Sequence, residues 1–164
     1  AFALSTGVGH ATDLIDFDYA RYRYGNIAAA VQRGIEGSAT LRLAAATEVR
    51  LGATFLGSRD DGGDALLRRP QWSGSAVLST AAGRASGELA LVWVGPRVDL
   101  DPVTFARTNA AGFVTASLAL RVPLRDWCAF RLRLENLADR SYAEVLGYPA
   151  PGRRACVGIE TVIQ

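Results

Sequence analysis

Glu48-Val49-Arg50-Leu51-Gly52-Ala53-Thr54-Phe55 is the stretch of sequence that best predicts the fold. Polar or small residues at 48, 50, 52 and 54 alternate with apolar residues at 49, 51, 53 and 55. Successive side chains of a β-strand point to opposite faces, so this period of two predicts a strand with one polar and one apolar face. The same alternation recurs in 113–122, 127–137 and 154–163.

Strands are predicted along nearly the whole chain, because helical periodicity is poor almost everywhere. The eight predicted strands cover 3–14, 27–43, 48–58, 72–81, 86–98, 113–122, 127–137 and 154–163. Short connections at 44–47, 82–85 and 123–126 alternate with long polar connections at 15–26, 59–71, 99–112 and 138–153. In an up-and-down antiparallel sheet every second connection lies at the same end, so one end has short turns and the other has long loops.

This asymmetry is typical of outer-membrane barrels, whose strands of about ten residues cross the bilayer at a tilt. The apolar face would then meet lipid and the polar face would line the lumen. The polar face carries charged side chains at Glu36, Arg42, Glu48, Arg50, Glu88, Arg121, Arg131, Arg133, Glu135 and Glu160. We predict an all-β chain that forms an antiparallel, up-and-down transmembrane β-barrel segment of about eight strands.

Two other interpretations fit the same alternation. One is a self-contained small outer-membrane β-barrel with a structural or adhesive role, and the other is a soluble lipocalin-like carrier with an apolar ligand inside. Eight strands can close into a narrow barrel whose interior is filled by side chains, with the inward Arg and Glu paired. They can also remain an open sheet with two reactive edges. We expect the closed form to give the ordered chain.

The composition excludes several other classes of protein. The 164 residues are 49% hydrophobic, which is too apolar for a disordered chain. Eighteen basic residues, all Arg, stand against 16 acidic ones, and this balance argues against nucleic-acid binding. One histidine and two cysteines do not supply a zinc site or a catalytic triad, so we predict no enzyme activity. Alternation places Cys128 and Cys156 on opposite faces, which argues against a disulfide between them.

Three further stretches resemble a known family. The first is Asp13-Leu14-Ile15-Asp16-Phe17-Asp18, followed by Tyr24-Gly25-Asn26 and Gln32-Arg33-Gly34-Ile35-Glu36-Gly37. The second is Ala65-Leu66-Leu67-Arg68-Arg69-Pro70, and the third is Leu134-Glu135-Asn136-Leu137-Ala138-Asp139-Arg140-Ser141-Tyr142 with Leu146-Gly147-Tyr148-Pro149-Ala150-Pro151-Gly152-Arg153. In this order they resemble the C-terminal barrel strands of TonB-dependent outer-membrane receptors, above all the cobalamin (vitamin B12) receptor branch. The most specific motif residues are Asn136, Asp139, Gly147, Gly152 and Arg153.

The resemblance, which covers about residues 12–163, implies a protein of the bacterial outer membrane that takes up a corrinoid (cobalamin) or a siderophore-type chelate. Such receptors are 22-stranded barrels filled by an N-terminal plug domain. Residues 1–164 would be the last eight strands, with the plug domain and the earlier strands absent. The implied partners are outer-membrane lipid, the chelate, TonB through the missing N-terminal part, and the barrel-assembly machinery. Without the plug, we expect the chain not to transport by itself.

The predicted loops contain the candidate ligand-binding residues, which are Tyr19, Tyr22, Tyr24, Arg97, Asp99, Tyr142 and Tyr148. For Tyr142 and Tyr148 an anchoring role within the loop is the favoured alternative. Asn136 and Asp139 follow a strand end, where their side chains can bond nearby backbone groups. No cofactor is predicted. Asp60, Asp61 and Asp64 are candidate ligands for a loop-bound calcium, but they lack the remaining spacing and the closing Glu of an EF-hand.

Overall fold

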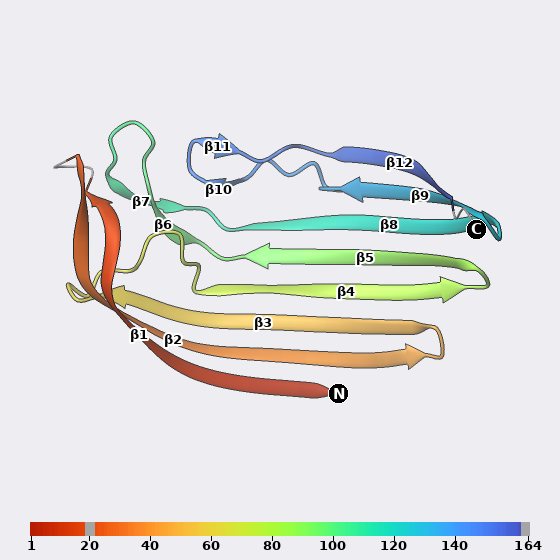
Figure 1. Ribbon diagram of the computed structural model, residues 1–164, viewed down its shortest axis with the longest axis horizontal. Coiled ribbons are helices and arrows are strands. Elements are labelled where there is room, and N and C mark those ends of the chain that lie inside the picture. The colour runs from red at the N-terminus through yellow and green to blue at the C-terminus, as the bar shows by residue number, and fades with distance from the viewer. Residues whose placement is uncertain (19–21, 162–164) are drawn as a thin grey trace.

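The computed structural model describes residues 1–18 and 22–161 of the chain. Its main feature is an 8-stranded antiparallel sheet in the order β1-β2-β3-β4-β5-β8-β9-β12 (Figure 1). The strands are β1 (Phe2–Asp18), β2 (Arg23–Ala44), β3 (Thr47–Asp60), β4 (Trp72–Ala82), β5 (Ala85–Val94), β8 (Phe113–Arg125), β9 (Cys128–Glu135) and β12 (Arg154–Thr161). The prediction of an all-β, up-and-down antiparallel chain is confirmed.

The connections differ between the two ends of the sheet, as predicted. Short turns join β2 to β3, β4 to β5 and β8 to β9 at one end (Figure 1). The other end carries the loops 61–71, 95–112 and 136–153. Two of these loops contain hairpins that the sequence pattern did not reveal. They are β6 (Arg97–Leu100) with β7 (Arg107–Ala110), and β10 (Ala143–Val145) with β11 (Tyr148–Pro149).

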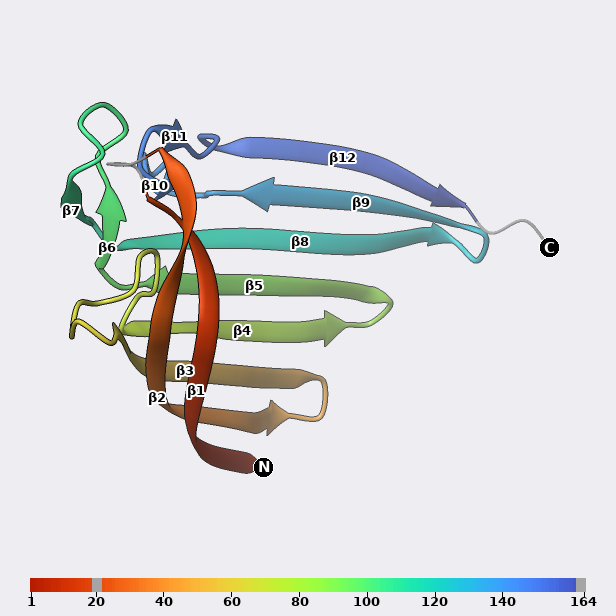
Figure 2. The ribbon, with the colours of Figure 1, turned by 60° about the vertical axis from the view of Figure 1, so that its left-hand side comes forward.

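The first two strands form a much longer hairpin than the sequence predicts. A loop was expected over 15–26, but the ladder continues until Asp18 pairs with Arg23. Strand β3 joins β2 only from the pair Ala30 and Asp60 onward, so the end of the hairpin has no third strand beside it. That part bends away from the direction of the other strands (Figures 1 and 2). Its polar composition resembles a loop, but two strands can satisfy each other's backbone hydrogen bonds without an apolar pattern.

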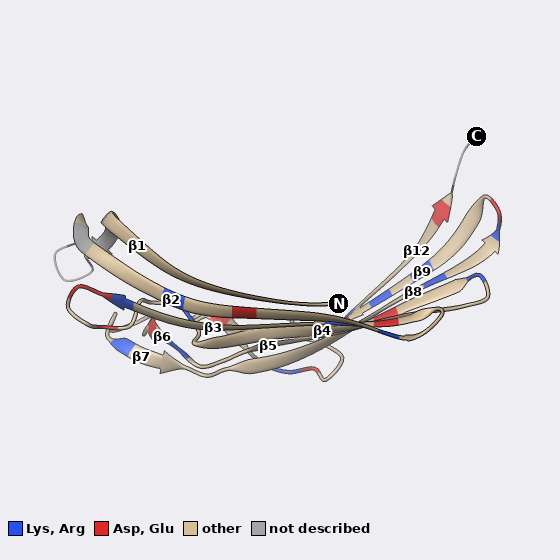
Figure 3. Cartoon of the chain, turned by 90° about the horizontal axis from the view of Figure 1, so that it is seen from below, with Lys and Arg blue, Asp and Glu red and all other residues tan. Residues whose placement is uncertain are grey.

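The sheet is open, with β1 and β12 at its edges, and the expected narrow closed barrel is not formed by the described residues. Seen from below, the sheet is a single curved layer in which the loop end of β1 and the short-turn end of β12 rise on the same side (Figure 3). A closed eight-stranded barrel has an interior filled by side chains. The many charged side chains on one face of this sheet would lose their water in such an interior, which favours the gentler curvature.

Strand register places the predicted polar and apolar side chains on opposite faces of the sheet. On the polar face Glu48 lies opposite Ser79, which lies opposite Glu88. The apolar face is solvent-exposed, with large side chains at Leu4, Val8, Ile35, Leu41, Leu51, Leu78, Leu91, Val114, Val157 and Ile159. No second layer of described residues covers this face (Figure 3). An apolar surface of this extent is stable only against another apolar medium.

Aromatic side chains lie at both ends of the apolar face. At the loop end, Phe55 pairs with Trp72 with ring centroids 4.5 Å apart, and Trp93 lies on the same face nearby. At the opposite end, Trp127 in the β8–β9 turn is exposed. Aromatic girdles at the two interfaces are typical of membrane barrels. No helix among the described residues is long and apolar enough to cross a membrane.

Cys128 and Cys156 are both free, and they lie on opposite faces of neighbouring strands. Cys156 pairs in register with Arg133 of the polar face, whereas Cys128 pairs with Thr161. The predicted absence of a disulfide between them follows from this register, because side chains on opposite faces of a sheet cannot approach each other.

We predict that Gly74→Ala destabilises the protein by about 1–3 kcal/mol, the usual cost of overpacking a filled site. An added Cβ at Gly74 would collide with the ring of Trp93 and with the carbonyl oxygen of Gly52. Gly52→Ala is the matched control, because its Cβ would meet only Ser75 Oγ at 3.6 Å. Urea unfolding of the protein in phospholipid vesicles measures both variants. Equal midpoints for the two would contradict the close packing of Trp93 on Gly74.

Candidate functional site

Three loops at the long-loop end are joined through one buried carboxylate. Asp99 on β6 has an exposed fraction of 0%. Its Oδ1 accepts hydrogen bonds from Arg68 Nε at 2.9 Å and from the Leu100 backbone N–H at 2.8 Å. Its Oδ2 accepts a bond from the Leu146 backbone N–H at 2.9 Å. Because Arg68 and Leu146 come from the neighbouring loops, Asp99 holds loops 61–71, 95–112 and 136–153 together.

The charge of Asp99 is maintained by these partners. Burial raises the pKa of this carboxyl group, but hydrogen bonds from Leu146, Arg68 and Leu100 and the positive charge of Arg68 lower it. The net result is a pKa below the ordinary value, so Asp99 stays ionised at neutral pH. Arg68 is half-exposed, but Asp99 is buried, and a buried carboxylate is stable only when its lone pairs are satisfied, as they are here.

Arg97 connects two of these loops, 95–112 and 136–153, by a second route. Its side chain is only 6% exposed and donates hydrogen bonds to the carbonyl oxygens of Ala143, at 2.7 Å, and of Glu144. The guanidinium carbon lies 5.7 Å from the centroid of the Phe113 ring, within the range of a cation–π contact. The ring of Tyr142 lies 4.3 Å from that of Phe113, centroid to centroid.

These contacts change the interpretation of three predicted ligand-binding residues. Asp99 has no exposed surface to offer a ligand, and Arg97 has very little, because both are engaged inside the loop cluster. Tyr142 is half-buried against Phe113, in agreement with the anchoring alternative. Sequence reasoning missed the partnership of Asp99 with Arg68, since 31 positions separate the two and no local pattern relates their loops.

The family motif after β9 works as a set of local backbone bonds. Asn136 Nδ2 donates to the carbonyl oxygens of Arg140, at 2.9 Å, and Pro151, at 3.2 Å, while its Oδ1 accepts from Arg140 N–H. Asp139 Oδ1 accepts from the Arg153 N–H at 2.7 Å. Both Asn136 and Asp139 have positive φ, a conformation that Asn and Asp tolerate better than most residues. The prediction that these two side chains satisfy nearby backbone groups is confirmed.

The two glycines of the motif are also explained by local geometry. A Cβ at Gly152 would come within 2.9 Å of Asp139 Oδ1, the atom that binds Arg153. Gly147 has a φ of 87°, in the left-handed region, and faces Pro102 of the neighbouring loop. These glycines therefore allow the close approaches that order the loop.

Other predicted residues lie elsewhere at the loop end. Tyr22 and Tyr24 are exposed at the end of the β1–β2 hairpin, and Tyr148 is exposed on β11. Tyr19 lies outside the described residues. Asp60 Oδ1 accepts from the Asp64 N–H at 2.8 Å and closes its own turn. Within residues 1–18 and 22–161, no group of three His, Cys, Asp or Glu side chains could hold a metal ion.

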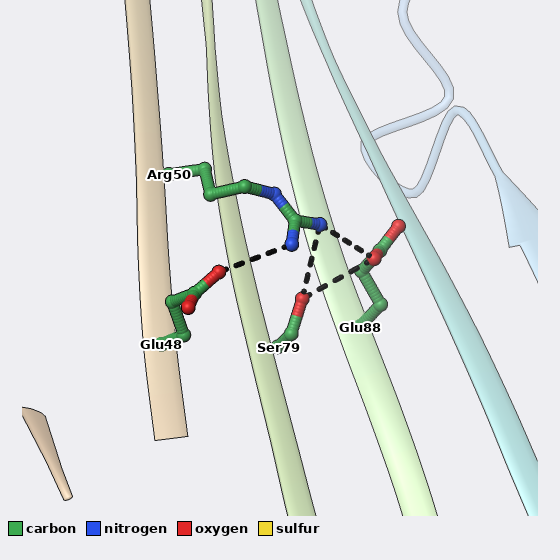
Figure 4. Close-up of polar contacts among 4 residues, drawn as sticks. All are labelled: Glu48, Arg50, Ser79 and Glu88. Carbon is green, nitrogen blue, oxygen red and sulfur yellow. Dashed lines mark hydrogen bonds and ion pairs between the residues drawn. The ribbon is translucent and has the colours of Figure 1, made fainter. Parts of the chain in front are cut away.

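The polar face of the sheet carries paired charges that line a hollow near the short-turn end. Arg50 of β3 reaches Glu48 at 3.2 Å and, across β4, Glu88 of β5 at 3.4 Å, and Ser79 bridges them (Figure 4). On the other side of the hollow, Arg121 and Arg131 both bind Glu160.

Glu135, nearer the loops, binds both Arg133 and Arg154. Arg and Glu side chains of this face are therefore paired at these positions even though the sheet is open. These ion pairs form three clusters, centred on Arg50, Glu160 and Glu135, and each cluster joins side chains from at least two strands.

No protein-family model matches this sequence. Among solved structures, the chain is similar to the outer-membrane ferripyoverdine receptor of Pseudomonas aeruginosa, with a TM-score of 0.78 and 17% identity over 98% of this chain and 24% of that one. It is similar to the copper transporter OprC, with a TM-score of 0.81 and 20% identity over 98% and 27%. It is also similar to the ferric-catecholate import receptor Fiu of E. coli K12, with a TM-score of 0.77 and 16% identity over 98% and 25%.

These likenesses show the fold. The sheet has the architecture of a barrel segment of TonB-dependent outer-membrane receptors, the family that the sequence resembles. The chain spans about a quarter of the length of the receptors it matches.

We predict that Asp99→Ala destabilises the loop cluster by about 1–3 kcal/mol, because it leaves the Leu146 and Leu100 N–H groups without their acceptor and removes the link to Arg68. Hydrogen exchange should become faster throughout loops 61–71, 95–112 and 136–153. Asp126→Ala, which removes a 91% exposed partner of Arg84 at the opposite end, is the control and should change stability by less than about 1 kcal/mol. Unchanged exchange in Asp99→Ala would show that the loops are held by other contacts.

The same carboxylate predicts a pH dependence of the loop cluster. The pKa of Asp99 is lower in the folded protein than its ordinary value of 3.8. The stability that the ionised carboxylate adds to the folded loops is therefore fully present above pH 3.8. It is lost as the pH falls through the lower folded pKa. Resistance of the loops to pepsin should therefore be constant down to about pH 4 and decline below it. Asp99→Ala should lack this decline, and an equal decline in both proteins would assign it to other groups.

Proposed function

We propose that residues 1–164 form the C-terminal part of the barrel wall of a TonB-dependent receptor in the bacterial outer membrane, and that the complete protein imports a metal chelate. The observation that carries this proposal is the distribution of polarity on a one-layer sheet. Its apolar face is uncovered, while its charged face lines a hollow. A membrane barrel requires this arrangement, with hydrocarbon outside and water inside.

The same distribution argues against a soluble carrier. A lipocalin-like barrel would place the apolar face inside around its ligand and the charged face in water. In this sheet the hollow is lined instead by charged side chains, among them Glu48 and Glu88 on one side and Arg121 and Arg131 on the other. A self-contained small barrel is disfavoured by the open sheet, whose edge strands β1 and β12 do not pair with each other in the described residues.

The class of substrate is supported by the structural likenesses and by the sequence. The similar receptors bind or import ferripyoverdine and ferric catecholate, and one similar protein transports copper. We infer a siderophore-type metal chelate as the cargo. A corrinoid is the alternative that the sequence resemblance favours, and none of these three neighbours is a corrinoid receptor by its description. Exposed tyrosines at the loop end, Tyr22, Tyr24 and Tyr148, offer amphipathic rings for contact with such a molecule.

The remaining parts of the proposal concern the complete protein. Opening of the barrel and coupling to TonB would belong to a plug domain, and insertion would depend on the barrel-assembly machinery. We propose no catalytic step and no bound cofactor for the barrel wall itself.

Membrane fractionation and uptake assays test this proposal. We expect the complete protein in the outer-membrane fraction, extracted only by detergent, and TonB-dependent uptake of a ⁵⁵Fe-labelled siderophore by cells that express it. Radiolabelled cobalamin, assayed in parallel, distinguishes the corrinoid alternative. Cells without the gene provide the baseline. A protein that remains monomeric in buffer without detergent would overturn the proposal.

A further inference from the structure

The charges on the polar face are unequally distributed between its two sides. On β3 and β5 one arginine, Arg50, serves two glutamates, Glu48 and Glu88 (Figure 4). On β8, β9 and β12 the ratio of arginine to glutamate is reversed, because four arginines form ion pairs with only two glutamates. They are Arg121 and Arg131 on Glu160, and Arg133 and Arg154 on Glu135. This second side, here called the arginine strip, therefore has an excess of positive charge.

The strip includes a juxtaposition that costs stability. Arg121 and Arg131 lie directly opposite each other in the register of β8 and β9. Like charges at directly opposed positions of a sheet repel. The single carboxylate of Glu160, two residues beyond Gly158 in β12, offsets this repulsion only in part. A ladder with a purely structural role would pair each arginine with its own acid, so the surplus indicates another anion.

The arginines also retain unused hydrogen-bond donors. A guanidinium group has five N–H donors. Arg133 is paired with Glu135 through Nε at 2.9 Å, and its side chain is 68% exposed. Glu135 is also bound by Arg154, and Glu160 is shared by two arginines, so the carboxylates of the strip are already engaged. The terminal nitrogens of Arg133 are thus available to a molecule in the hollow.

We propose that the arginine strip is an anion-binding track for the carboxylate, catecholate or phosphate groups of the imported solute. Register orders it from the loop end to the short-turn end as Arg154, then Arg133, then Arg131 beside Arg121. Residues two apart on a strand are separated by roughly 6.6 Å, so an anion can move from one arginine to the next without losing all its contacts. The inference rests on the proposed function and adds to it that the solute is an anion guided along β8, β9 and β12.

Cys156 is a native reporter at the centre of the strip, because it lies opposite Arg133. In the complete protein with Cys128→Ser, its reaction rate is measured with a sulfonate-bearing (anionic) and a trimethylammonium-bearing (cationic) methanethiosulfonate. We expect the anionic reagent to react faster, and citrate, as a probe anion, to slow it. Arg131→Gln and Arg133→Gln should each lower the anionic-to-cationic rate ratio about threefold, after screening by salt.

These two variants spare the structure as far as possible. Arg131→Gln leaves Glu160 bound to Arg121, and Arg133→Gln leaves Glu135 bound to Arg154. Glu88→Gln, which leaves Arg50 bound to Glu48, is the matched control and should not lower the ratio. Arg133→Lys should restore most of it. Three results would overturn the proposed anion-binding track: an anionic-to-cationic rate ratio near one, a ratio that neither arginine variant changes, or no reaction of Cys156 with either reagent.

An uptake assay then separates this inference from the proposed function. If the parent protein imports a ferric tris-catecholate, which is an anion, Arg131→Gln/Arg133→Gln should slow import at least fivefold with unchanged binding at the cell surface. Import at the parent rate would overturn the track and leave the receptor function intact. If the parent protein is absent from the outer membrane, the receptor function fails, whereas the Cys156 reactivity still reports on anion binding by the strip.

Discussion

The structure depends on the pairing of backbone polar groups within a one-layer sheet whose apolar face is left uncovered. Inside a bilayer no water is available to an unpaired N–H or C=O group, so every such group needs a partner in the protein. The continuous ladder from β1 to β12 provides these partners across the sheet. In the proposed membrane setting its two edge strands, β1 and β12, would each pair with a further strand, because an open edge in lipid leaves a row of unpaired groups. The open, gently curved form suits a segment of a larger barrel.

Charges are accommodated in two different ways in this fold. At the loop end Asp99 is excluded from water, and its hydrogen bonds with Arg68, Leu100 and Leu146 make it a rigid link between loops. On the polar face the ion pairs are partly exposed, so each contributes little to stability. Their sign and distribution matter more, because partly exposed arginines can exchange one anionic partner for another. The loops therefore contain a buried and fully hydrogen-bonded charge, whereas the paired charges of the sheet remain partly exposed.

Much of the fold could be predicted from local patterns. Alternation in 48–55 identified a strand and both of its faces, and the short turns followed from the strand ends. The bonds of Asn136 and Asp139 were predictable because their partners lie close in the sequence or on the same loop. The strands of the β1–β2 hairpin were predicted over 3–14 and 27–43, but its extension to the pair Asp18 and Arg23 was missed, since that end lacks the third strand and the alternation that reveal a strand. Arg97 and Asp99 were taken for ligand contacts because a charged loop residue looks the same whether it is buried or exposed.

The sequence by itself determined most of the strands, their two faces of different polarity and the up-and-down order of the sheet, because these depend on side-chain period and turn length. Only the tertiary structure decided that eight strands stay open, that Asp99 is buried among three loops, and that two arginines share each glutamate of β9 and β12. Those features depend on register between strands and on contacts across loops. A period of two residues places a side chain on a face, but the neighbour it meets there is set by the pairing of distant segments.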